Sequence, residues 1–310
     1  KIYKMNIDYF SKVRILDGGM GQTLLEKGLK AKGSLWSATA LIEEKYHQLV
    51  IDTHLDFIKS GADVIVTNNF AARRSRTIQN NVDEHFNYAN QKAGELALKA
   101  KEVSKKNILI AGSLPAQYDT YVPDKRDQNL IKKDFYDQAN LLKPFIDFFY
   151  LDVLSSIREI EIALNVVEKM NLPVLVGIHI RENGKFSSGE TITKMVETCK
   201  SKNWLGLIAS CVSPEIIENN IDEIRSLKIP FGFKANLWKE QPLPVGEIVR
   251  IDAAGFGENP VDVLGTRDDV TAEKFYDFSK KMVNKGATIL GGCCETTPSH
   301  INAISTLKQI

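Results

Sequence analysis

Short apolar segments recur along the chain, and each is apolar throughout instead of alternating apolar with polar residues. This pattern is typical of strands that are buried on both faces of a parallel sheet. The segments are rich in β-branched and aromatic residues, which favours strands over helices. The expected strands are residues 13–19, 63–68, 108–113, 148–153, 173–180, 206–210, 230–235 and 287–292.

Helical patterns separate these segments. After the fourth segment, Ile157, Ile160 and Leu164 recur at the spacing of one helix face. The same kind of spacing occurs over residues 42–57 and over residues 298–304. Strands and helices therefore alternate along the whole sequence, as they do in α/β proteins.

Eight strands that alternate with helices predict an α/β fold of one (β/α)8 TIM barrel, and we expect residues 1–310 to form a single domain. The alternative is an open, doubly wound sheet, but no Gly-rich dinucleotide-binding loop follows any of the expected strands. Residues 114–130 and 236–270, after the third and seventh strands, are too long for simple connections. Long loops after barrel strands lie on the catalytic face.

The composition excludes several classes of partner. Charged residues make up 25% of the chain and the net charge is +1, which gives no electrostatic reason to expect nucleic acid. No apolar run approaches the roughly 20 residues that cross a bilayer, and the N-terminal stretch has no apolar region like that of a signal peptide. Four cysteines in 310 residues do not indicate a fold that is stabilised by a disulfide framework. We therefore expect a cytoplasmic protein with free thiols. The sequence leaves open whether the protein forms a homo-oligomer.

Polar residues occur where the expected strands end. The carboxyl ends of barrel strands converge on one mouth, so these side chains should lie near one another. In particular, the strands before Cys211 and before the Cys293-Cys294 pair are separated by only one strand, so three thiols could meet. The residues at strand ends are Asp17, Asn68, Asn69, Asp152, His179, Cys211, Cys293 and Cys294.

The adjacent cysteines allow several interpretations. They could be small buried apolar residues, a strained vicinal disulfide or two ligands of a metal. Neighbouring side chains on a strand point to opposite faces, so both can reach one ion only where the backbone is irregular, and we expect Gly291-Gly292 to provide that freedom. Three thiolates suit zinc with an open fourth position, although no CxxC pair is present.

The segments LDGGMGQTLLEKG, GADVIVTNNFAARRSR, IAGSLPAQYDTY, SCVSPE and GATILGGCCETTPSHI together resemble the homocysteine S-methyltransferase family. The resemblance implies a zinc-dependent barrel enzyme that methylates the sulfur of homocysteine to give methionine. It makes Cys211, Cys293 and Cys294 the ligands of Zn2+, with the substrate thiol in the fourth position. No catalytic residue beyond the zinc-activated thiol is implied.

The resemblance also implies substrate-binding residues. Asp17 matches the family's clamp on the homocysteine amino group, and Asp152 stands where relatives usually carry Glu. Gly18 and Gly19 would let the backbone approach the amino acid closely. The full set of expected substrate-binding residues is Asp17, Gly18, Gly19, Asp152, Trp36 and Asn69.

The methyl donor is an onium compound in this family, and onium groups bind aromatic faces. Trp36 matches a tryptophan of betaine-using relatives, but Ala71 and Val153 occupy the positions of their two tyrosines. Tyr118 and Tyr121 are candidates to replace them. We therefore expect a sulfonium donor such as S-methylmethionine.

Two other functions stay open: the homocysteine-activating component of a cobalamin-dependent system, and a non-catalytic zinc or redox-sensing barrel. For other polar and charged residues, a structural role is the simpler interpretation. Cys199 is expected to pack in a helix and His179 to fill the barrel interior, whereas nothing else supports Schiff-base chemistry at Lys234. Arg73, Arg74 and Arg76 are expected to form a solvated cluster, although one of them could bind a substrate carboxylate.

Overall fold

A computed structural model describes residues 7–199 and 203–309, so residues 1–6, 200–202 and 310 of the expected domain lie outside the described residues. Eight parallel strands form one sheet in the order β1-β8-β7-β6-β5-β4-β3-β2, which confirms the predicted strand number and their positions. The strands are β1 Arg14–Ile15, β2 Val64–Val66, β3 Leu109–Pro115, β4 Phe148–Leu154, β5 Val174–Ile178, β6 Trp204–Val212, β7 Phe231–Ala235 and β8 Ile289–Gly292.

The sheet closes between its first and second strands. Leu16 and Val64 form a parallel bridge, and the Asp17 backbone N–H donates to the carbonyl oxygen of Val64 at 3.0 Å. On the other side of this bridge, the Asp63 N–H donates to the carbonyl of Ile15 at 2.7 Å. Because β1 also pairs with β8, the closed (β/α)8 barrel is confirmed and the open doubly wound sheet is wrong.

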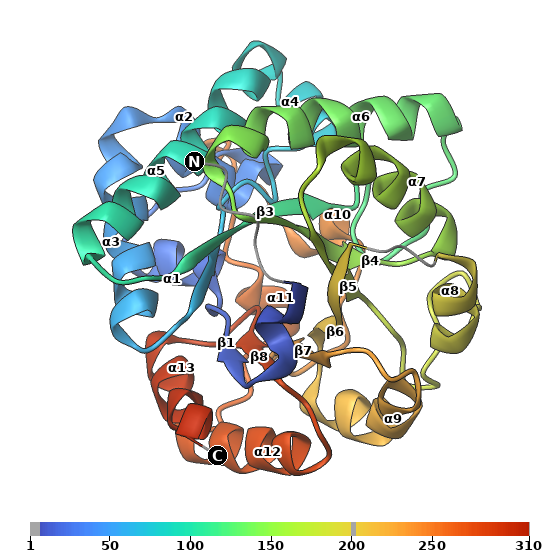
Figure 1. Cartoon of the computed structure of the whole chain (residues 1–310). Helices are drawn as coiled ribbons and strands as arrows, with labels where there is room; N and C mark the ends of the chain where they lie inside the picture. The colour runs from blue at the N-terminus through green and yellow to red at the C-terminus, as the bar shows by residue number, and fades with distance from the viewer. Residues whose placement is uncertain (1–6, 200–202, 310) are drawn as a thin grey trace.

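Helices surround the strands on all sides (Figure 1). The helices of the outer ring are α3 His47–Lys59, α5 Phe86–Ser104, α6 Gln128–Leu142, α7 Ile157–Val167, α8 Ile192–Thr198, α9 Pro214–Ser226, α12 Ala272–Asn284 and α13 Pro298–Ser305. Shorter α-helices lie in loops and are α1 Met20–Glu26, α2 Thr39–Ile42, α4 Arg74–Gln79, α10 Val245–Ile248 and α11 Val261–Leu264. The 3-10 helices are η1 Ile7–Ser11, η2 Gly33–Ala38, η3 Glu44–Tyr46, η4 Asp83–His85, η5 Lys143–Phe145, η6 Glu168–Met170 and η7 Thr306–Gln309.

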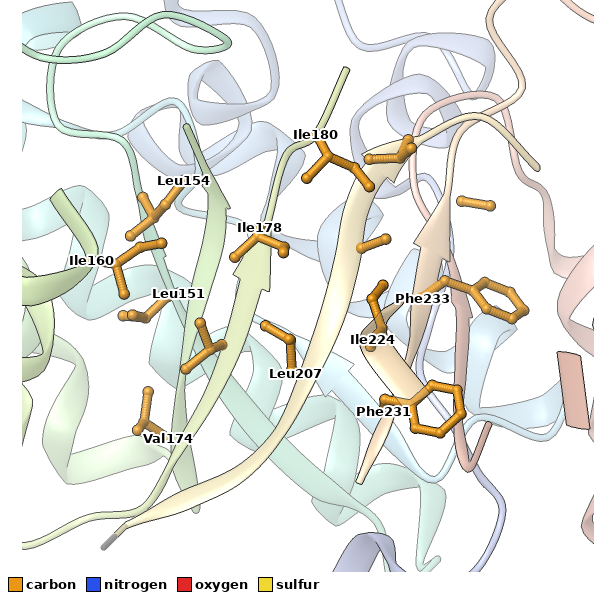
Figure 2. Close-up of a cluster of buried hydrophobic side chains, with 14 of the residues drawn as sticks. Leu151, Leu154, Ile160, Val174, Ile178, Ile180, Leu207, Ile224, Phe231 and Phe233 are labelled. Carbon is orange, nitrogen blue, oxygen red and sulfur yellow. The ribbon is translucent and has the colours of Figure 1, made fainter. Parts of the chain in front are cut away.

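The largest apolar cluster lies between the strands and the outer helices. Figure 2 shows alternate residues of β4 to β7 in this layer, among them Leu151, Ile178 and Phe233. They pack with helix residues such as Ile160 of α7 and Ile224 of α9, each of which is fully buried. Side chains along a strand point alternately to the two faces of the sheet. The strands are apolar at successive positions because both faces are buried.

A second apolar cluster fills the barrel interior. Phe10 of η1 is fully buried there and meets the ring of Phe148 edge-on, with centroids 6.1 Å apart. The same cluster contains Val64 and Leu175, from β2 and β5. The dark blue η1 in Figure 1 thus covers the end of the barrel where strands begin, because Phe148 and Val64 are the first residues of their strands. The sequence did not predict this plug.

The loops expected after the third and seventh strands are present as residues 116–127 and 236–271. A third long connection, residues 16–46, follows β1 and was not expected. The pattern over residues 42–57 is not one helix, because the backbone of Glu43 is extended (φ −93°, ψ 109°) and α3 begins only at His47. All three long connections lie at the carboxyl ends of strands, which is where barrel enzymes bind substrates.

No helix among residues 7–199 and 203–309 combines the length and apolar composition required to span a membrane.

Candidate active site

Three thiols meet at the carboxyl ends of β6 and β8. The Sγ atoms of Cys211 and Cys294 are 3.8 Å apart, and those of Cys293 and Cys294 are 3.9 Å apart. All three sulfur atoms lie within 4.8 Å of one another. The structure therefore brings together the three cysteines that the sequence predicted to converge, and this group could hold a metal ion.

A tight turn allows the adjacent cysteines to share one site. Cys293 follows β8, and its carbonyl accepts hydrogen bonds from the backbone N–H and the hydroxyl of Thr296, at 3.2 and 2.6 Å. Glu295 in this turn has φ 63°, and Cys211 on β6 has φ 55°, so both adopt left-handed conformations that are strained for such residues. The irregular backbone is therefore at these two positions.

The glycine pair before the cysteines has a different role from the one expected. Gly291 and Gly292 belong to the regular strand β8, and neither has a positive φ. A Cβ atom on Gly292 would lie 2.1 Å from Oγ1 of Thr296, and one on Gly291 would lie 2.8 Å from Cβ of Leu16. The two glycines are thus needed for close packing of the cysteine turn and β1, and not for backbone freedom.

The three thiols do not ionise independently. Hydrogen bonds from Cys293 and Cys294 hold the pKa of Cys211 well below its usual range, and the Tyr121 hydroxyl, 3.3 Å from its sulfur, contributes as well. The same interactions with Cys211 raise the pKa values of Cys293 and Cys294. One thiolate is therefore favoured, and a cation is required before all three can be ionised together.

A cavity opens onto the thiols and contains most of the expected substrate-binding residues. Asp17, Gly18, Gly19, Trp36 and Asp152 line it. Cβ atoms on Gly18 or Gly19 would lie within 3.0 Å of the side chain of Thr296 or the carbonyl of Cys293, so these glycines also let β1 approach the cysteine turn.

Asn69 is the exception among the expected substrate-binding residues. It is fully buried outside the cavity lining, where its Nδ2 donates to the carbonyl of Ser113 at 2.9 Å and its Oδ1 accepts from the hydroxyl of Thr67 at 2.6 Å. Its neighbour Asn68 lines the cavity instead. The side chain of Asn69 thus ties the end of β2 to β3.

Charged side chains form one part of the cavity lining, the charged side. The Nζ of Lys234 donates to Oδ1 of Asp17 at 2.5 Å, and the Val66 N–H donates to Oδ2 of Asp17 at 2.7 Å. Asp152 accepts a hydrogen bond from the Ser113 hydroxyl at 2.8 Å. Burial raises the pKa of Asp152 to about 6, against the opposing effect of Lys234. Asp17 is therefore paired with Lys234, whereas Asp152 forms no ion pair among the described residues and feels Lys234 and Arg73 at longer range, which leaves its carboxylate available to a further positive charge.

Lys234 has a structural and electrostatic role that the sequence analysis did not assign. Its side chain is almost fully buried, and an ion pair explains how this charge can be accommodated at the end of an otherwise apolar strand. The one sign of this role in the sequence is a lysine within the apolar strand segment FGFKA, because a buried lysine requires a charged partner.

Aromatic residues form a second part of the cavity lining, the aromatic side. Trp36, Phe70, Tyr121 and Trp238 line the cavity and pack in one cluster with Cys211 and Cys294. Of the two expected tyrosines, Tyr121 is buried beside the thiols, whereas Tyr118 is 52% exposed. Phe70 and Trp238 were not predicted, because neither lies in a pattern that distinguishes a binding residue from a packing one.

The expectation of a solvated arginine cluster is wrong for two of its three members. Arg73 is 1% exposed and Arg76 is 4% exposed, and both line the cavity. Arg74 points elsewhere: it is paired with Asp83 and stacks on the ring of Phe86 at 3.7 Å. The three arginines, which are close together in the sequence, therefore occupy two environments. Arg73 and Arg76 line the cavity, whereas Arg74 forms a half-buried ion pair.

The remaining candidates have structural roles. Cys199 is buried apart from the other cysteines, and its Sγ is 4.0 Å from the carbonyl of Ile157. His179 is buried with its ring centroid 4.8 Å from that of Tyr121, and burial lowers its pKa to about 4, so it is neutral near pH 7. Lys234 is committed to its ion pair, which leaves no support for Schiff-base chemistry.

Comparison with known proteins identifies this arrangement. Residues 14–307 match the model of the family described as homocysteine S-methyltransferase. The chain belongs to the homocysteine S-methyltransferase family. This is a family of methyltransferase enzymes, and the resemblance seen in the sequence motifs is confirmed.

Relatives of the homocysteine S-methyltransferase family match over nearly the whole chain. Homocysteine S-methyltransferase 1 from Arabidopsis thaliana is 26% identical, over 94% of this chain and 92% of its own length. An S-methylmethionine–homocysteine S-methyltransferase from Pongo abelii is 27% identical, over 95% of this chain and 78% of its own length.

A solved structure supports the fold of the homocysteine S-methyltransferase domain. The metallated form of the homocysteine methyltransferase MmuM from Escherichia coli superimposes with a TM-score of 0.76, covering 97% of this chain and all of that chain. At 19% identity this likeness concerns the fold, which agrees with the closed barrel described above.

Proposed function

We propose that this protein is a zinc-dependent enzyme that transfers a methyl group from a sulfonium donor to the thiol of L-homocysteine and gives methionine. The observation that carries the proposal is the group of three cysteine sulfurs at the wall of a cavity whose lining contains both charged and aromatic residues. Residues 1–310 would act as a single homocysteine-binding domain.

The spacing of the sulfur atoms fits zinc. With zinc–sulfur bonds of about 2.3 Å and tetrahedral angles, two sulfur ligands are about 3.8 Å apart. The Sγ of Cys294 lies 3.8 Å from that of Cys211 and 3.9 Å from that of Cys293, and all three sulfurs lie within 4.8 Å of one another. Cys211, Cys293 and Cys294 would hold the ion and leave a fourth position on the cavity side. When bound, zinc lowers the pKa of a thiol at that position, so that homocysteine is present as a thiolate near pH 7.

The charged side of the cavity suits the amino group of homocysteine. Asp17 is paired with Lys234, whereas Asp152 forms no ion pair among the described residues, and an ammonium group beside it would pair with its carboxylate. Asp152 replaces the longer Glu expected from the family, and the hydrogen bond from Ser113 fixes its carboxylate beside the cavity. Gly18 and Gly19 would bring the backbone close to the same amino acid.

The aromatic side suits a sulfonium methyl donor. The faces of Trp36, Tyr121 and Trp238 can stabilise a positive charge beside the thiols. Ala71 and Val153, which replace two tyrosines of betaine-using relatives, both line the cavity, so the betaine cage lacks two walls. The name of the Pongo abelii relative gives S-methylmethionine as donor, which supports the same choice.

A donor screen tests this proposal. The purified, zinc-loaded protein is supplied with homocysteine and, in turn, S-methylmethionine, S-adenosylmethionine, betaine or methylcobalamin as sole methyl source, and methionine is measured. We expect the highest kcat/KM with S-methylmethionine. Turnover with betaine but not with S-methylmethionine would overturn the sulfonium assignment. Turnover with methylcobalamin alone would indicate the cobalamin-dependent alternative, and zinc binding without any turnover would indicate a sensor.

The proposed chemistry also bears on location and partners. The three thiols must stay reduced to bind a metal, and the four cysteines are free in the structure, so we propose a reducing compartment, the cytoplasm. The partners would be small molecules, homocysteine and its methyl donor, and we assign none that is a nucleic acid or a membrane. The oligomeric state, including a homo-oligomer, would be settled by sedimentation of the purified protein.

A further inference from the structure

Arg73 is a buried charge that forms no ion pair with an acidic side chain among the described residues, although Asp119 and Asp152 act on it from a longer distance. Its NH1 donates to the carbonyl of Ala116 at 2.8 Å, and its NH2 donates to the hydroxyl of Thr120 at 3.0 Å. Its Nε–H has no hydrogen-bond acceptor. Burial lowers the pKa of Arg73 to about 9, which still leaves the guanidinium protonated near pH 7.

Its neighbour on the cavity wall does not supply the missing negative charge. Arg76 is also buried, and its NH2 is 3.3 Å from a carboxylate oxygen of Asp119. Arg76 is thus paired with Asp119, whereas Asp119 and Asp152 act on Arg73 only from beyond ion-pair distance. A buried charge without a counterion is costly, whereas a carboxylate bound by a guanidinium is a strong, directional contact.

The hydrogen-bonding capacity of the cavity wall points to the same kind of ligand. Among the described residues that line the cavity, the buried side-chain nitrogen and oxygen atoms without a hydrogen-bond partner are mostly N–H donors. An excess of donors calls for a ligand that is rich in acceptors, and a carboxylate offers two oxygens and a negative charge. The donor groups are Gln22 Nε2, Trp36 Nε1, Arg73 Nε, Arg76 Nε and Trp238 Nε1, and the one acceptor is Gln22 Oε1.

Arg73 belongs to the aromatic side of the cavity. Its guanidinium lies over the ring of Phe70, 5.3 Å from the centroid, and Phe70 packs in the cluster that contains Cys211 and Cys294. Thr120, which Arg73 binds, is followed directly by Tyr121, whose hydroxyl is 3.3 Å from Sγ of Cys211. Of the two carboxylates proposed to bind the ammonium group of homocysteine, Asp17 is paired with Lys234 on β7, whereas Asp152 acts on Arg73 from beyond ion-pair distance.

We propose that Arg73 binds the carboxylate of the methyl donor, so that the enzyme selects sulfonium compounds that carry a carboxylate. This inference rests on the proposed function, because it assumes that a sulfonium donor occupies the aromatic side. The bond to the carboxylate would orient the donor so that its charged sulfur lies among the aromatic faces next to the cysteine site.

A simpler role for Arg73 is to hold the loop of residues 116–127 through its two existing hydrogen bonds. A loop anchor and a carboxylate-binding residue differ in one measurable respect. Loss of an anchor lowers turnover with every donor alike, whereas loss of a carboxylate contact lowers turnover only with donors that have a carboxylate. The ratio of kcat/KM for two donors in one preparation also does not depend on the fraction of folded protein.

The experiment compares S-methylmethionine with its decarboxylated analogue, 3-aminopropyl dimethylsulfonium, using the zinc-loaded enzyme and homocysteine. We expect the wild type to prefer S-methylmethionine by about 10- to 100-fold, the loss expected when one charged hydrogen-bonding contact is removed. In Arg73→Met the preference should fall to near unity, and in Arg73→Lys it should be partly kept. Arg74→Met is the matched control, since Arg74 lies outside the cavity lining and should keep the wild-type ratio.

Three outcomes would overturn the inference. The first is an equal kcat/KM for the two donors in the wild type, and the second is an unchanged ratio in Arg73→Met. The third is that Arg73→Met loses its discrimination between homocysteine and 3-mercaptopropylamine while its donor ratio stays normal, which would assign the bound carboxylate to homocysteine. Absence of methionine with both donors in the wild type would instead contradict the proposed function itself.

Discussion

The Nζ atom of Lys234 lies 2.5 Å from Oδ1 of Asp17, although the two residues are 217 positions apart in the chain. Both side chains are buried, with 5% and 1% exposure. The ion pair joins the end of β7 to the end of β1 across β8, and it stands where the cysteine turn packs against β1. It therefore links the closure of the barrel to the arrangement of the site.

Removal of Lys234 should destabilise the protein. Lys234→Met leaves the buried Asp17 carboxylate without its partner, and such a loss costs about 3–5 kcal/mol in the free energy of unfolding. Urea denaturation followed by circular dichroism measures this change. Lys185→Met, at an exposed lysine, is the control and should change stability by less than about 0.5 kcal/mol. Equal changes in the free energy of unfolding for the two substitutions would show that the buried ion pair contributes no more to stability than an exposed lysine does.

Binding of homocysteine should weaken in mild acid. Because burial raises the pKa of Asp152 to about 6, its carboxylate takes up a proton as the pH falls through 6, and a neutral carboxyl group cannot pair with the substrate ammonium. The KM for homocysteine should be constant above about pH 7 and rise by about tenfold per pH unit below pH 6. Steady-state kinetics at saturating donor measure this profile.

The variant Asp152→Asn provides the control for this pH profile. It lacks the titrating group, so its KM for homocysteine should be high and nearly independent of pH between 5 and 7. A wild-type KM that stays flat over this range would contradict the role of Asp152.

Loss of one cysteine from the cluster should remove both zinc and activity. In Cys293→Ser the group of three thiolates is incomplete, and we expect little bound zinc and a decrease in kcat/KM of at least about 100-fold. Cys211→Ser should behave in the same way. Metal analysis of the dialysed proteins, beside methionine formation, measures both quantities.

Cys199→Ser is the matched control for the cluster, because Cys199 is buried apart from it. Its zinc content and turnover should equal those of the wild type. Full turnover in a zinc-depleted Cys293→Ser protein would contradict the proposed mechanism.

Loss of the plug residue Phe10, at the end of the barrel opposite the cavity, should lower stability without changing activity. Phe10→Ala removes a fully buried ring from the barrel interior, which costs about 3–5 kcal/mol in the free energy of unfolding. Since Phe10 packs where the strands begin and the substrate cavity lies where they end, kcat/KM per folded molecule should not change. Tyr136→Ala, at a tyrosine that is 52% exposed, should leave both quantities nearly unaltered. A Phe10→Ala protein as stable as the wild type would rule out the plug.

The barrel could be predicted because its signals are local. Apolar strands and amphipathic helices each leave a pattern within a few residues, and the alternation of the two indicates the topology. The plug formed by η1 leaves no such pattern, since the segment IDYFS has no periodicity and its burial depends on strands that close around Phe10. Tertiary contacts of this kind are invisible to a reading of neighbouring residues.

The cysteine site could be located from the ends of the expected strands, whereas the charged residues around it could not. Lys234 and Arg73 are buried by contacts with residues distant in the sequence, and exposure is the ordinary state of such side chains. The role of Gly291 and Gly292 was misjudged for a related reason. The sequence shows that a glycine lacks a side chain, but only the structure shows which atoms occupy the space.

The turn that carries Cys293 and Cys294 is held by the first loop of the barrel. The Gly19 N–H donates to the carbonyl of Thr296 at 2.9 Å, and the Gly292 N–H donates to the carbonyl of Asp17 at 3.0 Å. The thiols thus reach their common position only after the last strand has docked beside the first. Bound metal is therefore a reporter of a completed fold: a chain that stops before β8 has no site, and a colorimetric zinc assay on refolding protein would follow the final step of assembly.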